Sequence, residues 1–221
     1  DSSGNNNHFT PTSMGANNIV VDGPANSDTK EITLYSCIDP AKLNGGTLSN
    51  NNLTYDVGGG SNYGLGNFYV DSGKYYWEVI LTHTGFTFGV AGLGTTHTGN
   101  GNGSITAMYD AANGEKKVNG STASYTLAGS HSPADGQRGQ VELNLTDNEI
   151  KFGVNNNWGP AISITDAAYT PHFARNGSDS TDDGTAVFAE ADWTYSAPTG
   201  YTALTSTITG IGNSAVQHEP R

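Results

Sequence analysis

An alternating run of aromatic and β-branched residues, at positions 74–83, constrains the fold of this chain more than any other feature. Tyr75, Trp77 and Val79 occupy every second position, which is typical of a central β-strand with an apolar face. Turn-forming residues flank the run on both sides. Residues 86–93 continue with a second apolar run, which the sequence predicts to be the returning, neighbouring strand of a hairpin.

Similar short runs recur along the chain, and each is bounded by Gly, Asn, Asp or Pro. They lie at residues 31–37, 52–57, 105–109, 141–145, 149–154, 161–164, 172–174 and 186–190. The chain also holds 30 glycines, and only 14% of its residues are charged. Many short strands separated by turns, without a helical period, predict an all-β, antiparallel β-sandwich.

The charge balance restricts the partners. Nine basic residues face 21 acidic ones, for a net charge of -12. So few cations cannot neutralise a phosphate backbone, so we expect no nucleic-acid partner and no anionic membrane partner. No run approaches the roughly 20 apolar residues of a spanning helix, so no membrane insertion is expected.

Cys37 is the single cysteine of the chain. A single cysteine excludes an internal disulfide framework, and Cys37 is predicted to be a small buried residue.

Composition divides the chain into three parts. Residues 1–30 are rich in Asn, Ser, Gly and Asp and are predicted to be an N-terminal arm or linker. Residues 31–205 form the predicted sandwich domain, and residues 206–221 a polar C-terminal tail. Extended arms become ordered only when a neighbouring surface holds them. Such arms therefore favour a chain that belongs to a larger assembly.

Several motifs of the central part resemble the SPRY domain. They are SGKYYWEV at 72–79, FGVAG at 88–92, GQVELNL at 139–145, EIKFGVNNNW at 149–158, and the runs 169–173 and 198–204. The resemblance implies a bent antiparallel sandwich of concanavalin A-like architecture. Two positions depart from the family pattern: Gln140 replaces an acidic residue, and Asn155-Asn156-Asn157 replaces an Asn-Gly turn.

The N-terminal segments carry a second resemblance. Residues 1–10, 21–26 and 39–43 are similar to segments that precede SPRY modules in tailed-bacteriophage virion proteins, where the end of a laminin-G-like segment often comes first. This resemblance implies a structural or binding protein of the virion, which is an extracellular particle. The protein would be a tail-fibre, tail-associated or capsid-decorating module. Its implied partners are other virion subunits, in a homo-oligomer or mixed assembly, and a glycan or protein of the host surface.

Catalysis is not expected. A retaining glycosidase needs two carboxylates about 5–5.5 Å apart, yet Tyr76 and Ile80 occupy the positions that alternate with Glu78. The sequence also lacks the Gly-x-Ser-x-Gly, His-Glu-x-x-His and Gly-x-x-x-x-Gly-Lys motifs. We therefore interpret Glu78 as a structural residue, Trp77 and Tyr75 as core residues, and the scattered histidines as ordinary loop residues.

Ligand binding is predicted in the loops at the ends of the strands, where sandwich domains carry variable recognition residues. The candidates combine flat aromatic faces with amide and carboxylate groups, a mixture suited to sugar or protein contact. They are Tyr109, Asp110, Asn155, Asn156 and Trp158.

Calcium is the one cofactor for which the sequence offers oxygen-rich loops. Calcium takes six to eight oxygen ligands, and two loops present oxygen-bearing side chains at short spacing. The candidates are Asp1, Ser3 and Asn5 in the first loop and Asp179, Asp182 and Asp183 in the second.

Three other function classes stay open at this point. A lectin-like module would bind glycans by stacking a sugar on Trp158 or Tyr109. An intracellular SPRY adaptor would be a soluble monomer with a peptide ligand. A polysaccharide hydrolase would lose its activity when one carboxylate is changed.

Overall fold

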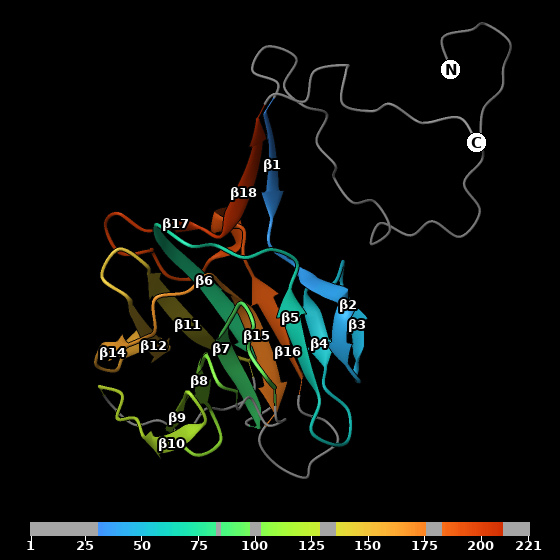
Figure 1. Ribbon diagram of the computed structural model, residues 1–221, viewed down its shortest axis with the longest axis vertical. Coiled ribbons are helices and arrows are strands. Elements are labelled where there is room, and N and C mark those ends of the chain that lie inside the picture. The colour runs from blue at the N-terminus through green and yellow to red at the C-terminus, as the bar shows by residue number, and fades with distance from the viewer. Residues whose placement is uncertain (1–30, 83–84, 98–102, 129–135, 176–182, 210–221) are drawn as a thin grey trace, which may run out of the picture.

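The computed structural model describes residues 31–82, 85–97, 103–128, 136–175 and 183–209. These residues form eighteen β-strands and a short 3-10 turn at Glu190–Asp192, with no α-helix among them. No helix within these ranges is long and apolar enough to cross a membrane. The strands stack in two antiparallel layers, and a two-stranded ribbon extends from one end (Figure 1). The predicted antiparallel β-sandwich is confirmed.

The first layer is a seven-stranded sheet. Its strands, in spatial order, are β10 (Ser121–Ser124), β9 (Glu115–Val118), β8 (Thr106–Asp110), β7 (Phe86–Gly92), β15 (Tyr169–Arg175), β5 (Tyr63–Gly66) and β2 (Ile38–Asn44).

The second layer is a nine-stranded sheet. Its main order is β13 (Asn157–Trp158), β12 (Glu149–Val154), β11 (Gln137–Asn144), β6 (Lys74–Leu81), β16 (Asp183–Val187), β4 (Thr54–Asp56) and β3 (Thr47–Ser49). Two short strands complete it: β14 (Ile162–Ser163) pairs with β12, and β17 (Thr202–Ala203) runs parallel to β6.

The ribbon pairs β1 (Glu31–Tyr35) with β18 (Thr205–Thr209), and Glu31 lies opposite Thr209. The chain therefore enters and leaves the sandwich side by side (Figure 1). Residues 206–209, which the sequence assigns to the C-terminal tail, form most of β18, so strand structure continues past residue 205.

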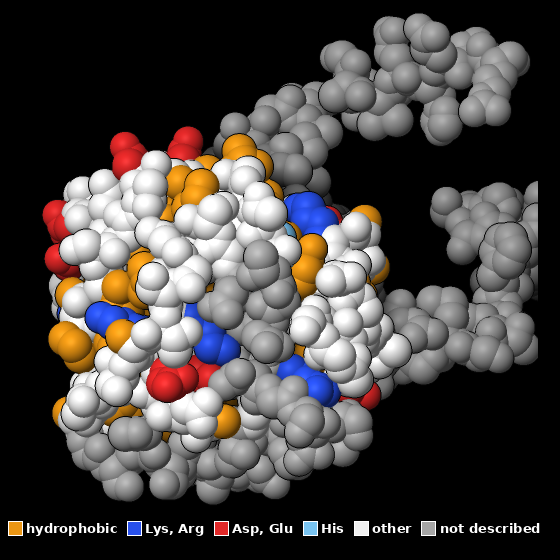
Figure 2. Space-filling model, turned by 60° about the horizontal axis from the view of Figure 1, so that its bottom comes forward, with side chains coloured by type: hydrophobic (Ala, Val, Ile, Leu, Met, Phe, Trp, Pro, Cys, Tyr) orange, Lys and Arg blue, Asp and Glu red, His pale blue; other side chains and the backbone are white. Residues whose placement is uncertain are grey.

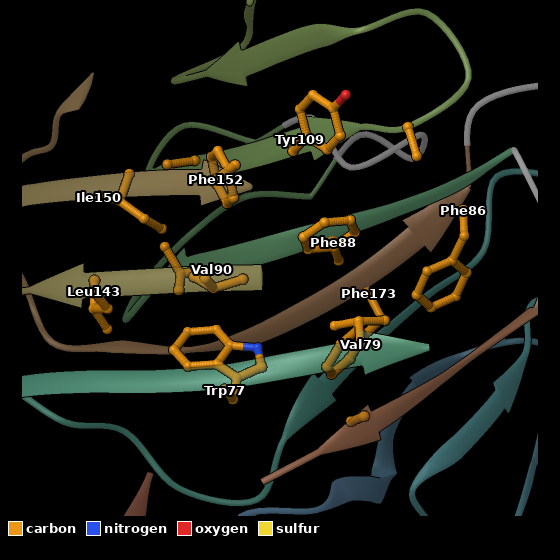
Figure 3. Close-up of a cluster of buried hydrophobic side chains, with 14 of the residues drawn as sticks. Trp77, Val79, Phe86, Phe88, Val90, Tyr109, Leu143, Ile150, Phe152 and Phe173 are labelled. Atoms are coloured by element: carbon orange, nitrogen blue, oxygen red, sulfur yellow. The ribbon is translucent and has the colours of Figure 1, made fainter. Parts of the chain in front are cut away.

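Aromatic and branched side chains fill the space between the layers (Figure 3). From the seven-stranded sheet, Phe88 meets Phe152 of the nine-stranded sheet, edge to face, with ring centroids 6.1 Å apart. Trp77 is fully buried, as predicted, while Tyr75 is half-buried and packs at the border of the core. Burial of each such side chain contributes about 1.5–3 kcal/mol, so this core is the main source of stability.

One predicted pairing is wrong. Residues 74–83 and 86–93 do not form a hairpin, because β6 pairs with β11 and β16 in one sheet while β7 pairs with β8 and β15 in the other. Each strand has an apolar face that needs a facing layer, and stacked sheets lie only about 10 Å apart. A short connection can therefore cross between layers. The short spacing that indicated a hairpin fits this crossover equally well.

Cys37 is only partly buried, which corrects the prediction of a buried residue. Burial, and to a lesser degree Asp39, raises the pKa of its thiol above the ordinary value.

Two glycines allow the layers to approach. A Cβ atom on Gly139 of β11 would lie 2.5 Å from the ring of Phe88, and one on Gly184 of β16 would lie 2.6 Å from the ring of Phe86. Both contacts are far below van der Waals distance. The aromatic rings of the seven-stranded sheet thus rest directly on the backbone of the opposite layer.

We expect Gly139→Ala to lower the free energy of unfolding by about 1–3 kcal/mol, because the added methyl group overpacks the core against Phe88. Gly59→Ala is the matched control, since a Cβ atom there meets nothing within 4 Å. Urea unfolding of both variants measures the difference. Equal midpoints for the two variants would contradict this account of the layer contact.

Candidate functional site

A buried polar network lies on the outer face of the nine-stranded sheet, centred on Glu78. Because Trp77 and Val79 face the core, the alternation of β6 turns Glu78 to the other side. Its side chain is fully buried and accepts hydrogen bonds from the backbone N–H groups of Thr194 (2.9 Å) and Tyr195 (2.7 Å). This carboxylate therefore fastens residues 190–201 onto the sheet, which confirms its predicted structural role.

Tyr76 and Gln140 extend this network toward the β12–β13 turn. The Tyr76 hydroxyl donates to Glu78 Oε1 at 3.0 Å, and Gln140 Nε2 donates to that hydroxyl at 2.9 Å. Burial raises the pKa of Tyr76 above its ordinary value, so the hydroxyl keeps its proton for Glu78. Gln140 Oε1 in turn accepts the backbone N–H of Asn156. Gln140, one of the two departures from the SPRY pattern, is thus an integral part of the network.

Three predicted site residues lie beside this network. Asn155 and Asn156 form the two-residue turn between β12 and β13, with φ angles of 47° and 63°. Positive φ at both positions is typical of a type I′ hairpin turn, which Asn tolerates better than most residues. Trp158 follows on β13, where its indole packs over Gly153 and donates to Asn156 Oδ1 at 3.2 Å.

The other two predicted site residues lie elsewhere. Tyr109 and Asp110 belong to β8 and not to a loop, and both are fully buried. The alternation of β8 places Tyr109 in the core, against Phe88 and Phe152. Asp110 forms a buried ion pair with Lys117 at 3.4 Å. Their prediction as loop residues that contact a ligand is wrong, because β8 continues through Asp110 between β7 and β9 and both side chains are buried.

The calcium candidates fall almost entirely outside the described residues: this holds for Asp1, Ser3, Asn5, Asp179 and Asp182. Asp183 is described; it opens β16 and pairs across the sheet with Asp56. Within the described ranges, no group of three or more His, Cys, Asp or Glu side chains could hold a metal ion. Calcium binding stays a prediction.

A groove of about 510 Å³ opens on the same outer face, and we call it the β16 groove. Its floor is a cross-strand row of side chains, formed by Ile80 of β6, Thr185 of β16 and Arg138 of β11. Val187, two residues further along β16, extends the floor. The rim consists of Tyr35, Ser36, Asn50, Asn51, Leu53 and Asp192.

Arg138 links the groove to the network beneath it. Its Nη1 atom lies 3.6 Å from Glu78 Oε2, and its backbone N–H donates to Asn155 Oδ1 at 2.9 Å. The groove, the β12–β13 turn and the anchored segment 190–201 are therefore parts of one connected surface.

Three consecutive asparagines with left-handed backbone lie at the groove rim and directly after it. Asn50, Asn51 and Asn52 have φ angles of 51°, 56° and 62°, so three consecutive non-glycine residues adopt left-handed conformations. Each costs roughly 1–2 kcal/mol relative to ordinary backbone. Such strain clusters at ligand clamps and active sites, where the surrounding structure holds it in place. The run of three asparagines was the one sequence signal that could have indicated this rim.

Charged and apolar side chains are interspersed on the face of the molecule that Figure 2 shows. The basic side chains visible there lie apart from one another.

Comparisons with known proteins identify the fold. No protein-family model matches the chain, and no curated protein matches it in sequence. Among solved structures, the SPRY domain of human HERC1 is similar with a TM-score of 0.58 and 22% identity, over 68% of this chain and 96% of that domain. The PSpry domain of TRIM65 is similar with a TM-score of 0.56 and 15% identity, over 70% of this chain and 93% of that domain. The chain therefore has the fold of SPRY domains.

We expect Glu78→Ala to lower the free energy of unfolding by about 2–4 kcal/mol, because two backbone N–H groups lose a charged acceptor. Glu149→Ala, at a half-buried position at the start of β12, is the control. Hydrogen exchange provides the specific readout: the amides of Thr194 and Tyr195 should lose protection in the Glu78 variant alone. Retained protection at both amides would show that Glu78 does not anchor this segment.

Proposed function

We propose that this chain is a non-catalytic protein-binding module and that the β16 groove receives a segment of the partner protein. The observation that carries the proposal is the groove itself, which combines apolar side chains such as Ile80 and Val187 with polar side chains such as Arg138 and Asp192. A concave site with few polar groups around an apolar surface is the usual form of a recognition pocket.

The groove is preorganised, which favours binding. Its floor residues lie on strands paired on both sides, and the Glu78 network fixes the segment that carries Asp192. A partner that docks there meets side chains already held in place, so less conformational entropy is lost on binding. Tyr35, with 52% of its surface exposed, offers an aromatic anchor at the rim.

The state of Glu78 supports a non-catalytic role. Its carboxylate is inaccessible and already accepts three hydrogen bonds. A general acid or base must reach the proton that it transfers, and Glu78 cannot do so without releasing the segment that it anchors.

A finer proposal concerns the setting of the module. Residues 1–10 resemble segments of tailed-bacteriophage virion proteins, and they lie outside the described residues, so the virion setting depends on sequence resemblance. The ribbon of β1 and β18 supports it in one respect. Because Glu31 and Thr209 are paired, the sandwich is attached to the rest of the chain at a single place, as suits display on a larger assembly. An intracellular adaptor would have the same fold and groove.

Glycan binding is the second candidate, and a separate pocket favours it. A pocket of about 440 Å³ is formed by residues of the segment 190–201, including Trp193, Tyr195 and Tyr201. Aromatic rings beside hydroxyl groups suit sugar stacking and hydrogen bonding. Tyr109, one of the two stacking residues that the sequence predicts, is buried and cannot serve.

A displayed random-peptide library, selected on the full chain, tests the first proposal. Selected peptides should bind the wild-type chain, and Tyr35→Ala should weaken their binding at least tenfold, because an aromatic anchor typically contributes 2 kcal/mol or more. Leu93→Ala is the matched control: Leu93 is 61% exposed and is not among the groove residues.

Two results would overturn the assignment of the groove. Peptides that bind Tyr35→Ala as tightly as the wild type would place the site elsewhere on the molecule. Glycan-array binding that Tyr201→Ala abolishes and Tyr35→Ala preserves would favour the second candidate instead.

A further inference from the structure

Two histidines meet on the outer face of the seven-stranded sheet, whereas the β16 groove lies on the nine-stranded sheet. Phe173 of β15 faces the core, so its neighbour His172 faces outward, opposite Gly89 of β7. His97, five residues after the end of β7, packs against it. The two ring centroids are 5.0 Å apart, with 73° between the ring planes.

Three of the four ring nitrogens of this pair have no hydrogen-bond partner in the described part of the chain. Both nitrogens of His172 and Nδ1 of His97 are buried, and no partner for them exists among the described residues. An unpaired buried polar atom costs about 1–3 kcal/mol. Native proteins seldom retain several such atoms together unless water or an ion satisfies them.

We propose that His97 and His172 together bind a divalent transition-metal ion of the zinc, nickel and copper class. The ring separation matches this chemistry. Two imidazoles that bind one tetrahedral ion through bonds of about 2.0–2.1 Å have ring centroids about 5 Å apart. The ion would fasten the segment that carries His97 to strand β15.

The surroundings keep both rings in the form that binds metals. Burial lowers the pKa of His172 well below its ordinary value, with a further contribution from His97, and burial also lowers the pKa of His97. Both imidazoles are therefore uncharged at neutral pH. Tyr63 fixes their orientation, because its ring stacks on His97 at 4.3 Å and meets His172 edge to face at 5.7 Å.

Two threonine hydroxyls on the same sheet face complete the polar surroundings. Thr170 lies two residues before His172 on β15, and Thr87 lies two residues before Gly89 on β7. Their Oγ1 atoms are also buried and have no hydrogen-bond partner within the described ranges. Hydroxyls at this place can bind the water molecules that accompany a metal ion, as outer ligands commonly do.

The donor set determines which ions fit. Imidazole nitrogen suits zinc, copper and nickel, whereas calcium and magnesium prefer oxygen ligands. No third His, Cys, Asp or Glu joins the pair within the described ranges. With two protein ligands, the site should bind more weakly than a four-ligand structural zinc site.

Calorimetric titration of the chelator-treated full chain with Zn²⁺ and Ni²⁺ tests the site. We expect one ion per chain and a rise in melting temperature of roughly 5 °C at an ion concentration about 100 times the Kd. Mg²⁺ and Ca²⁺ should give neither effect through this site. His97→Gln should weaken Zn²⁺ binding at least tenfold, and His218→Gln, outside the described residues, should leave it unchanged.

A measurement on the wild-type chain keeps the test independent of the folding of the variants. Long-range ¹H–¹⁵N spectra report each imidazole, and Zn²⁺ should shift the ring nitrogens of two of the six histidines, His97 and His172. The proposal fails if the folded chain binds neither ion at millimolar concentration. It also fails if the shifts occur at other histidines or if His97→Gln binds as the wild type does.

Discussion

The contact between the two sheets is the constraint on which the rest of this structure depends. Phe88 meets Phe152 across the layers, and Gly139 and Gly184 let the aromatic rings rest on the opposite backbone. Apolar burial of this kind is the main favourable term in folding. Because both inner faces are filled by the core, ligands can meet this domain only at its outer faces, its edges and its loops.

The buried polar groups on the two outer faces differ in their hydrogen bonding. On the nine-stranded sheet, Glu78 accepts three hydrogen bonds and holds a neighbouring segment in place. On the seven-stranded sheet, the rings of His97 and His172 lie in contact while three of their nitrogens have no partner in the described part of the chain. The hydrogen bonds of Glu78 therefore have a structural role, whereas the histidine pair is the basis of the metal site proposed above.

The fold of this chain and the side chains of its β16 groove bear on different questions, the architecture and the ligand. The chain shares its fold with the two SPRY domains at 22% and 15% identity. A fold shared at such low identity does not show that the ligands are shared. The β16 groove combines side chains from β6, β11 and β16 with rim residues such as Tyr35 and Asn51. The ligand proposed for the groove therefore has to be argued from these side chains and not from the shared fold.

The sequence by itself determined the all-β class and the buried position of Trp77 and indicated a structural role for Glu78, and its resemblance to SPRY domains located the turn at Asn155-Asn156. These features depend on alternation and turn chemistry, which act over a few residues. The tertiary structure alone decided that β6 and β7 lie in different sheets, that Tyr109 is buried, and that His97 meets His172 from 75 positions away. Strand pairing and burial follow from contacts between distant segments, and no local pattern in one sequence records which segments will meet.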